Sequence, residues 1–222
     1  MIKNKRVSPE IGIGVFTIPE AAIILEIPSY KINRWIGSYW KFKSHKEDVY
    51  SWGEGKERGF NFYTLIELII VKSFREIGVP FPKIKLAHDI LFDILKIPYP
   101  FAHSKLLSDG KNIFLEENST LLGLNKKKQY AFIDIISPYC KKIDFSNDNM
   151  AERYWPLGKT HSIIVDPNHS FGQPTIIGTN IPVFSLLKFI QAGESKEFIS
   201  KAYHLNLNHI EDVILFSRRM AA

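Results

Sequence analysis

Two helix-start signals lie close together near the N-terminus, and their spacing allows only short helices there. In Thr17-Ile18-Pro19-Glu20 the Thr17 hydroxyl can accept from the backbone N–H of Glu20, whose side chain reaches back to the helix start. Pro28 ends this helix because proline disfavours helical backbone in the residue before it. Ser29 is then expected to be the N-cap of a second helix over residues 30–36. The sequence predicts two short helices joined by a tight turn.

The second predicted helix has one apolar and one polar face. Ile32, Trp35 and Ile36 recur at helical spacing, so they are expected in the core. The polar face stays available to a partner, as in the recognition helix of a helix-turn-helix protein, which enters the major groove of DNA. The residues predicted to contact DNA here are Ser29, Tyr30, Lys31, Asn33 and Arg34.

An aromatic and basic stretch follows over residues 39–62 and is interrupted by Gly53, Gly55 and Gly59. Glycines between aromatic residues favour a β-hairpin, and basic side chains at its tip can contact phosphates. The stretch therefore predicts a wing. Its predicted phosphate contacts are Lys41, Lys43, Lys56 and Arg58.

Two longer helices are predicted after the wing. Thr64-Leu65-Ile66-Glu67 has the spacing of a second capping box and opens a helix that stops at Gly78. Pro82 suits the first turn of another helix, which continues to Leu95. Both helices are apolar enough to form a core.

This order of elements resembles the N-terminal domain of MerR-type regulators, over about a third of the chain. The resemblance implies a winged helix-turn-helix DNA-binding domain at residues 16–95, preceded by a tail at residues 1–15. The chain departs from the pattern after Leu95, where no long coiled-coil helix and no cysteine-bearing ligand loop follow, so metal sensing is not expected. The matching segments are Phe16-Thr17-Ile18-Pro19-Glu20-Ala21-Ala22, Pro28-Ser29, Phe62-Tyr63-Thr64 and Phe74-Arg75-Glu76-Ile77-Gly78-Val79.

Residues 96–158 are predicted to be a linking α+β segment. Strands are expected at 114–115, 143–145 and 153–155, and a short helix at 130–136 that Pro138 ends. The Lys126-Lys127-Lys128 run is interpreted as a solvated turn and receives no site.

Residues 159–222 are predicted to form a separate C-terminal domain. A strand at 163–167 and a tight hairpin at 171–183 precede three helices, at 183–191, at 196–203 with Ser195 as N-cap, and after Asn206. These helices have the outline of a helix-turn-helix. The whole chain is thus expected to be mainly α with small β elements.

The C-terminal segment looks like a small uncharacterised domain family found in bacterial antitoxin-like proteins. With the MerR-like start, the chain is similar to VapB-type antitoxins that accompany PIN-domain ribonuclease toxins. This resemblance implies a protein that binds double-stranded operator DNA and its cognate PIN-domain toxin. The segments that carry it are Ile163-Ile164-Val165-Asp166-Pro167, Ser170-Phe171-Gly172-Gln173-Pro174, Gly178-Thr179-Asn180-Ile181-Pro182-Val183 and Ala192-Gly193-Glu194-Ser195.

Arg218 and Arg219 are the candidate toxin contacts. A PIN-type toxin gathers carboxylates around a divalent metal, and an arginine entering that pocket could pair with them. The alternative is that the two arginines complement the negative end of the last helix. A homodimer is also expected, because two paired recognition helices lengthen the DNA site.

Composition and motifs exclude several other classes. The net charge of +6 is too mild to indicate a function alone, Cys140 is the single cysteine, and no apolar run reaches the roughly 18 residues of a membrane helix. A cytoplasmic protein without a membrane contact is expected. The seven histidines show no metal-ligand spacing, so no metal or other cofactor is predicted.

Two alternatives to a non-enzymatic antitoxin remain. One is a MerR-like transcription regulator that responds to a small molecule. The other is a nuclease built on Asp109, Asp144 and Asp166, although Asp109 and Asp166 lie at ordinary turn positions.

Overall fold

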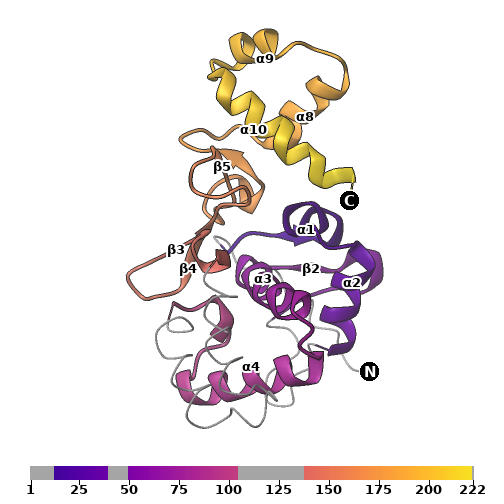
Figure 1. The fold of residues 1–222 in the computed structure, drawn as a ribbon, viewed down its shortest axis with the longest axis vertical. Helices are drawn as coiled ribbons and strands as arrows, with labels where there is room; N and C mark the ends of the chain where they lie inside the picture. The colour runs from indigo at the N-terminus through magenta and orange to yellow at the C-terminus, as the bar shows by residue number, and fades with distance from the viewer. Residues whose placement is uncertain (1–12, 40–49, 105–137, 222) are drawn as a thin grey trace, which may run out of the picture.

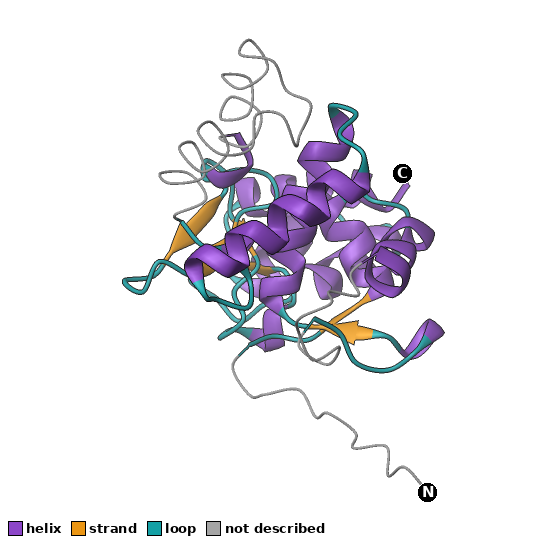
Figure 2. Ribbon diagram, turned by 90° about the horizontal axis from the view of Figure 1, so that it is seen from below, coloured by secondary structure: helices purple, strands orange, loops and turns teal. Residues whose placement is uncertain are grey.

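The computed structural model describes residues 13–39, 50–104 and 138–221. Several predictions fall outside these ranges: the N-terminal tail to residue 12, Lys41 and Lys43, Asp109, and the elements expected at 114–115, 126–128 and 130–136. The described chain is mainly helical with short strands (Figure 2). No helix within it is long and apolar enough to cross a membrane.

The first two helices are short and joined by a tight turn, as predicted. Strand β1 (Phe16–Thr17) leads into α1 (Ile18–Leu25). The capping box is present: the Glu20 N–H donates to Thr17 Oγ1 at 3.4 Å, and the Thr17 N–H donates to Glu20 Oε2 at 2.9 Å. Helix α1 ends at Glu26, whose φ of 53° is left-handed.

Helix α2 (Ser29–Arg34) begins one residue earlier than predicted. Pro28 is its N-cap, and the Pro28 carbonyl accepts from the N–H groups of Lys31 and Ile32. Ser29 is the first helical residue rather than the cap, because the fixed backbone of proline already suits this boundary. Ile32, Trp35 and Ile36 are buried as expected, and α2 continues into the π-helical turn η1 (Trp35–Tyr39).

Residues 52–59, within the stretch predicted to be a wing, fold back on themselves like a hairpin. Trp52 bridges Gly59 in antiparallel fashion around the 3₁₀ turn η3 (Gly55–Glu57). Strand β2 (Gly59–Phe60) then pairs with β1. The chain therefore comes back beside the start of α1 before the third helix begins.

Helix α3 (Phe62–Glu76) forms the centre of the N-terminal unit, which we define as residues 13–102, and packs against α4 (Phe81–Leu95). The predicted capping box at Thr64 is wrong. Asn61 is the N-cap and accepts from the Thr64 N–H at 2.9 Å, while the Thr64 hydroxyl donates to the carbonyl of Tyr50. The helix starts earlier because Asn61 occupies the capping position and Thr64 is buried.

The described end of the linking segment is joined to the C-terminal segment by backbone pairing. Strand β3 (Ile143–Phe145) pairs with β4 (Ala151–Tyr154), and β5 (Ile163–Ile164) pairs with β6 (Thr175–Ile176). Tyr154 and Val165 exchange two backbone hydrogen bonds of 2.8 and 2.9 Å, which connect the two pairs.

Three helices form the C-terminal module, defined here as residues 163–221. They are α8 (Val183–Gln191), α9 (Lys196–Tyr203) and α10 (Leu207–Ser217), followed by the 3₁₀ turn η7 (Arg218–Ala221). Their bounds agree with the prediction, and Ser195 Oγ accepts from the Phe198 N–H at 3.1 Å. The module lies at the opposite end of the long axis from α4, while the C-terminus returns beside α1 (Figure 1).

Candidate nucleic-acid interface

The first turn of α2 presents an exposed polar surface. Ser29, Lys31 and Arg34 are exposed, and Tyr30 is 67% exposed, a high value for an aromatic side chain. Recognition helices contact base edges mainly through their N-terminal residues. Four of the five predicted α2 residues are therefore accessible to a duplex.

Asn33, the fifth, is held by Arg58, which follows the turn η3. Arg58 Nη1 donates to Asn33 Oδ1 at 2.7 Å and to the Asn33 backbone carbonyl at 3.1 Å. A Cβ on Gly37 would lie 2.5 Å from the same Nη1, so glycine allows this close approach. Arg58, which was predicted to contact a phosphate, thus binds Asn33, which was predicted to contact a base. This contact fixes α2 to the hairpin. Lys56 lies on η3, at the tip of this return.

The two C-terminal arginines lie in different surroundings. Arg218 is exposed. The Arg219 side chain is only 10% exposed, and its guanidinium donates to the carbonyls of Ile24 and Pro156, both at 2.8 Å. It also lies 5.7 Å from the ring centre of Phe216. The expectation of two accessible arginines therefore needs correcting for Arg219, because its donors are taken by its own chain. Arg219 does lie at the C-terminal, negative end of a helix, as the alternative prediction had it, but the helix is α1 and not α10.

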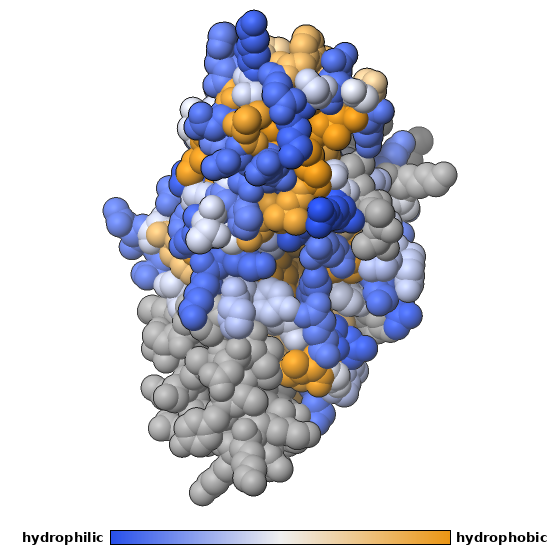
Figure 3. Space-filling view, turned by 45° about the horizontal axis from the view of Figure 1, so that its top comes forward, coloured by the Kyte–Doolittle hydropathy of each residue, from blue (hydrophilic) through white to orange (hydrophobic). Residues whose placement is uncertain are grey.

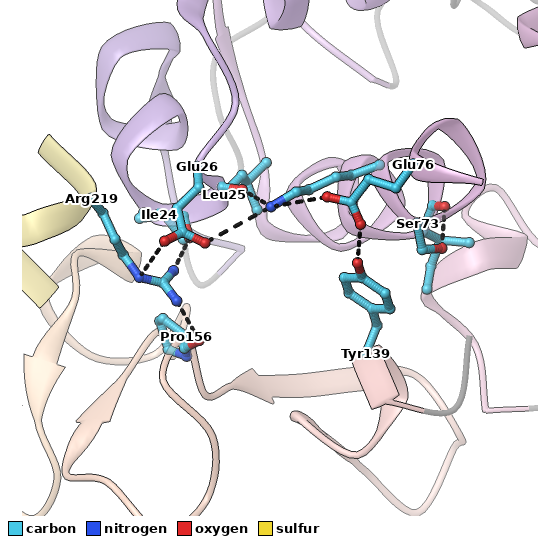
Figure 4. A network of polar contacts seen from close by, with 10 residues as sticks. Ile24, Leu25, Glu26, Ser73, Glu76, Tyr139, Pro156 and Arg219 are labelled. Carbon is cyan, nitrogen blue, oxygen red and sulfur yellow. Dashed lines mark hydrogen bonds and ion pairs between the residues drawn. The ribbon is translucent and has the colours of Figure 1, made fainter. Parts of the chain in front are cut away.

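A polar network that sequence reasoning missed surrounds the C-terminal end of α1 (Figure 4). Glu26 pairs with Arg219 at 3.5 Å and with Lys72 at 3.9 Å, and the Lys72 ammonium donates to the Leu25 carbonyl at 2.8 Å. Lys72 also lies 3.6 Å from Glu76, which accepts from the hydroxyl of Tyr139. Residues from α1, α3, the linking segment and η7 meet here. The Lys72–Glu76 spacing of four was the only signal in the sequence.

A second missed cluster lies inside the N-terminal unit. Glu67 and His88 are both buried, and His88 Nε2 lies 2.9 Å from Glu67 Oε2. Glu67 also accepts from the Phe101 N–H at 3.1 Å. Burial raises the pKa of Glu67 above its ordinary value, although His88 and the Phe101 N–H act in the opposite direction. Because Glu67 lies on α3 and His88 on α4, this buried cluster ties the two helices together.

Two of the three acids considered for a nuclease, Asp144 and Asp166, pair with cations. Arg153 donates to Asp166 at 3.1 Å and lies 3.9 Å from Asp144, which also pairs with Lys159 at 2.5 Å. Burial would raise the pKa of Asp144, but hydrogen bonds from Lys159 and Trp155 hold that pKa below its ordinary value. A guanidinium between the two carboxylates is a poor setting for a divalent cation. In residues 13–39, 50–104 and 138–221 no group of three His, Cys, Asp or Glu side chains is arranged to hold a metal.

The C-terminal module matches a described family. Residues 163–217 match the model of "Protein of unknown function (DUF433)". This range contains α8, α9 and α10 with the strands β5 and β6 before them.

Two relatives from Mycobacterium tuberculosis (strain ATCC 25618 / H37Rv) are similar over nearly the whole chain. One, named "Putative antitoxin VapB45", is 22% identical over 235 residues, which cover 96% of this chain and 98% of the relative. The other, "Uncharacterized protein Rv2308", is 20% identical over 219 residues, covering 92% and 90%. The crystal structure of Rv2018 from Mycobacterium tuberculosis aligns with a TM-score of 0.70 at 20% identity, over 90% of this chain and 96% of that one. That structure and this chain share a fold.

Proposed function

We propose that this protein is the antitoxin of a type II toxin–antitoxin system, in which the N-terminal unit binds operator DNA and the C-terminal module binds the toxin. The observation that carries the proposal is the similarity to the protein named as antitoxin VapB45, which extends over 96% of this chain. The cognate toxin we propose is a PIN-domain ribonuclease, and the protein's role is to mask it rather than to catalyse a reaction.

For DNA binding, the supporting feature is the exposed first turn of α2. Lys31 and Arg34 are assigned to base edges or nearby phosphates, with Ser29 and Tyr30 beside them. Asn33 and Arg58 are assigned a different role, which is to hold α2 against the hairpin at 2.7 Å. We further propose that two copies pair to place two such helices on adjacent half-sites, a state that sedimentation at micromolar concentration tests.

For toxin binding, the supporting feature is the surface of the C-terminal module. It exposes Phe189, Phe198 and Leu207, and apolar side chains lie among charged ones at this end of the molecule (Figure 3). Arg218 is the accessible arginine of the pair at the chain's end. Apolar anchors with an accessible arginine are typical of protein interfaces.

The DNA arm of the proposal is tested with a duplex carrying the protein's own promoter. The Lys31→Ala/Arg34→Ala double variant should bind at least about 30-fold more weakly, because two base contacts of about 1–3 kcal/mol each contribute about 2–6 kcal/mol together. Lys201→Ala, an exposed lysine of α9, removes one positive charge away from α2 and serves as the control. Equal binding by the double variant and the wild type would remove α2 from the interface.

The toxin arm is tested with the protein encoded by the neighbouring gene. Co-expressed, the two should co-purify, and the neighbour's ribonuclease activity should be suppressed in the complex. Arg218→Ala should restore part of that activity if Arg218 enters the metal pocket. Promoter binding without any complex would favour a regulator that answers a small molecule.

A further inference from the structure

We propose that Arg219 is a positioning residue for the DNA-contacting helix α2, so that the C-terminal module sets the DNA affinity of the N-terminal unit without touching DNA. This rests on the proposed DNA-binding function.

Helix α1 ends with a carbonyl that the residues directly following the helix cannot satisfy. The N–H that would normally bond to the Ile24 carbonyl belongs to residue 28, and that residue is Pro28, which has no N–H. The helix is also interrupted by Glu26 in the left-handed conformation, with φ at 53°. Donors from elsewhere are therefore needed at this end.

Two cations supply those donors. Arg219 Nη1 donates to the Ile24 carbonyl at 2.8 Å, and Lys72 donates to the Leu25 carbonyl at 2.8 Å. Both place positive charge at the negative end of the α1 dipole. Lys72 lies on α3 of the same unit, whereas Arg219 lies on η7, 195 positions after Ile24 in the sequence.

Arg219 is itself held firmly. Its Nη2 donates to the Pro156 carbonyl at 2.8 Å, its Nε pairs with Glu26 at 3.5 Å, and Phe216 of α10 lies under the guanidinium. Helix α10 is in turn fixed to the start of β5, because Asp212 accepts from the Ser162 N–H at 2.7 Å. The module thus reaches α1 through an ordered set of contacts.

The orientation of α2 depends on this turn because α2 is short. Six residues are too few for an independently stable helix. Its position is set by the buried Ile32, by the Arg58 contact and by the turn that joins it to α1. Loss of Arg219 removes the donor of the Ile24 carbonyl and one of the cations paired with Glu26 at that turn. The orientation of α2 toward DNA then varies more.

The experiment compares Arg219→Ala, Arg219→Lys and the wild type, with Lys201→Ala as a control that also removes one charge from the module. Binding to the promoter duplex is measured at several KCl concentrations, and hydrogen exchange is followed for a peptide covering residues 23–36. Arg219→Ala should bind about 2-fold to 30-fold more weakly, with an unchanged salt slope and faster exchange in that peptide. Arg219→Lys should be intermediate, because one ammonium cannot reproduce the geometry of two guanidinium nitrogens. Lys201→Ala should match the wild type.

Three results would overturn the proposal. The first is wild-type affinity and exchange in Arg219→Ala. The second is a salt slope lower by about 1, which marks a direct phosphate contact by Arg219. The third is weakened binding with unchanged exchange at residues 23–36. If Arg219→Ala does not fold, Arg219→Gln, which keeps part of the side chain and an amide donor without the charge, is measured instead. If the wild type binds no DNA, the proposed function fails, and the exchange experiment alone still decides whether Arg219 holds the turn.

Discussion

Helices α3 and α9 each have a polar side chain at the N-cap, but one cap is buried and the other is exposed. Ser195 caps α9 in the C-terminal module at an exposed site, where its hydroxyl accepts from the Phe198 N–H. Asn61 caps α3 in the N-terminal unit at a buried site, where its amide also donates to the Tyr99 hydroxyl at 2.6 Å. A local signal decides where α9 starts, whereas the start of α3 is part of the core.

The comparison extends to the charged groups that hold each region together. The N-terminal unit buries its Glu67–His88 pair, while Asp212 of the module pairs with His161, which lies just before the module, at a partly exposed site. Buried polar groups cost far more to disrupt than exposed ones. Substitution of a buried polar group in the N-terminal unit should therefore lower the free energy of unfolding more than substitution of a partly exposed polar group in the module.

The largest loss is expected for Glu67→Ala. Removing this carboxyl takes away the acceptor 2.9 Å from His88 Nε2 and the acceptor of the Phe101 N–H. The free energy of unfolding should fall by about 3–5 kcal/mol, the usual cost of removing one member of a buried pair. Urea denaturation measures the loss, with the exposed Glu197→Ala as control. A change below 1 kcal/mol would show that the buried pair does not stabilise the N-terminal unit.

Asn61→Ala should come next. The substitution removes a helix cap and a hydrogen bond to Tyr99, both within the core. A loss of about 2–3 kcal/mol is expected, since a cap contributes about 1 kcal/mol and an unsatisfied buried group costs more. The same urea experiment measures it. A loss no larger than that for Ser195→Ala would contradict the contrast between the two caps.

Asp212→Ala should cost about 2 kcal/mol, because the carboxylate accepts from the Ser162 N–H and hydroxyl, both at 2.7 Å, and lies 2.6 Å from His161 Nδ1. Burial would raise the pKa of Asp212, but the Ser162 and His161 hydrogen bonds hold it below its ordinary value. A lowered folded-state pKa contributes stability above the unfolded-state pKa, and that stability is lost as the pH falls through the folded-state value.

The wild type and the Asp212→Asn variant should accordingly converge in stability at acidic pH and differ at neutral pH. Thermal unfolding across pH 2–7 measures this. Glu211→Ala, next along the helix in an exposed pair with Lys196, is the matched control and should change little. A stability difference that stays constant with pH would exclude the linkage.

Ser195→Ala should have the smallest effect of the set. Only one exposed capping bond is lost, so a decrease of about 1 kcal/mol is expected. Ser195→Asp, which keeps a capping acceptor, should retain most of the stability. Equal losses for the two variants would mean that the cap does not stabilise α9.

The same contrast explains what could be predicted from the sequence. Local signals located α8, α9 and α10, the Thr17 cap and the strands at 143–145 and 163–164. They failed at Thr64, because threonine followed three residues later by Glu67 has the same spacing whether exposed as a cap or buried in a core. Tertiary contacts decide whether such a threonine is an exposed cap or a buried residue within the helix.

The surface of α2 was predictable because its apolar spacing set which residues face the core. The engagement of Asn33 by Arg58 was not, since 25 residues separate the two and only the folded hairpin brings them within 2.7 Å. Nor was the position of Arg219, whose acceptors are backbone carbonyls. Pro28 indicates that the Ile24 carbonyl lacks its usual donor, but nothing in the sequence indicates that a residue 195 positions away supplies one.

The backbone pairing of Tyr154 with Val165 has a consequence for dissecting the chain. These two residues connect the linking segment to the C-terminal segment across the boundary predicted at 158/159, and Ile163, Ile164 and Val165 are all buried. A fragment starting at residue 159 would leave the N–H and C=O of Val165 as an open strand edge flanked by apolar side chains. Such an edge is a template for pairing with another copy. The isolated fragment is therefore prone to self-association and precipitation, and a fragment that begins before β3 retains the strand that covers this edge.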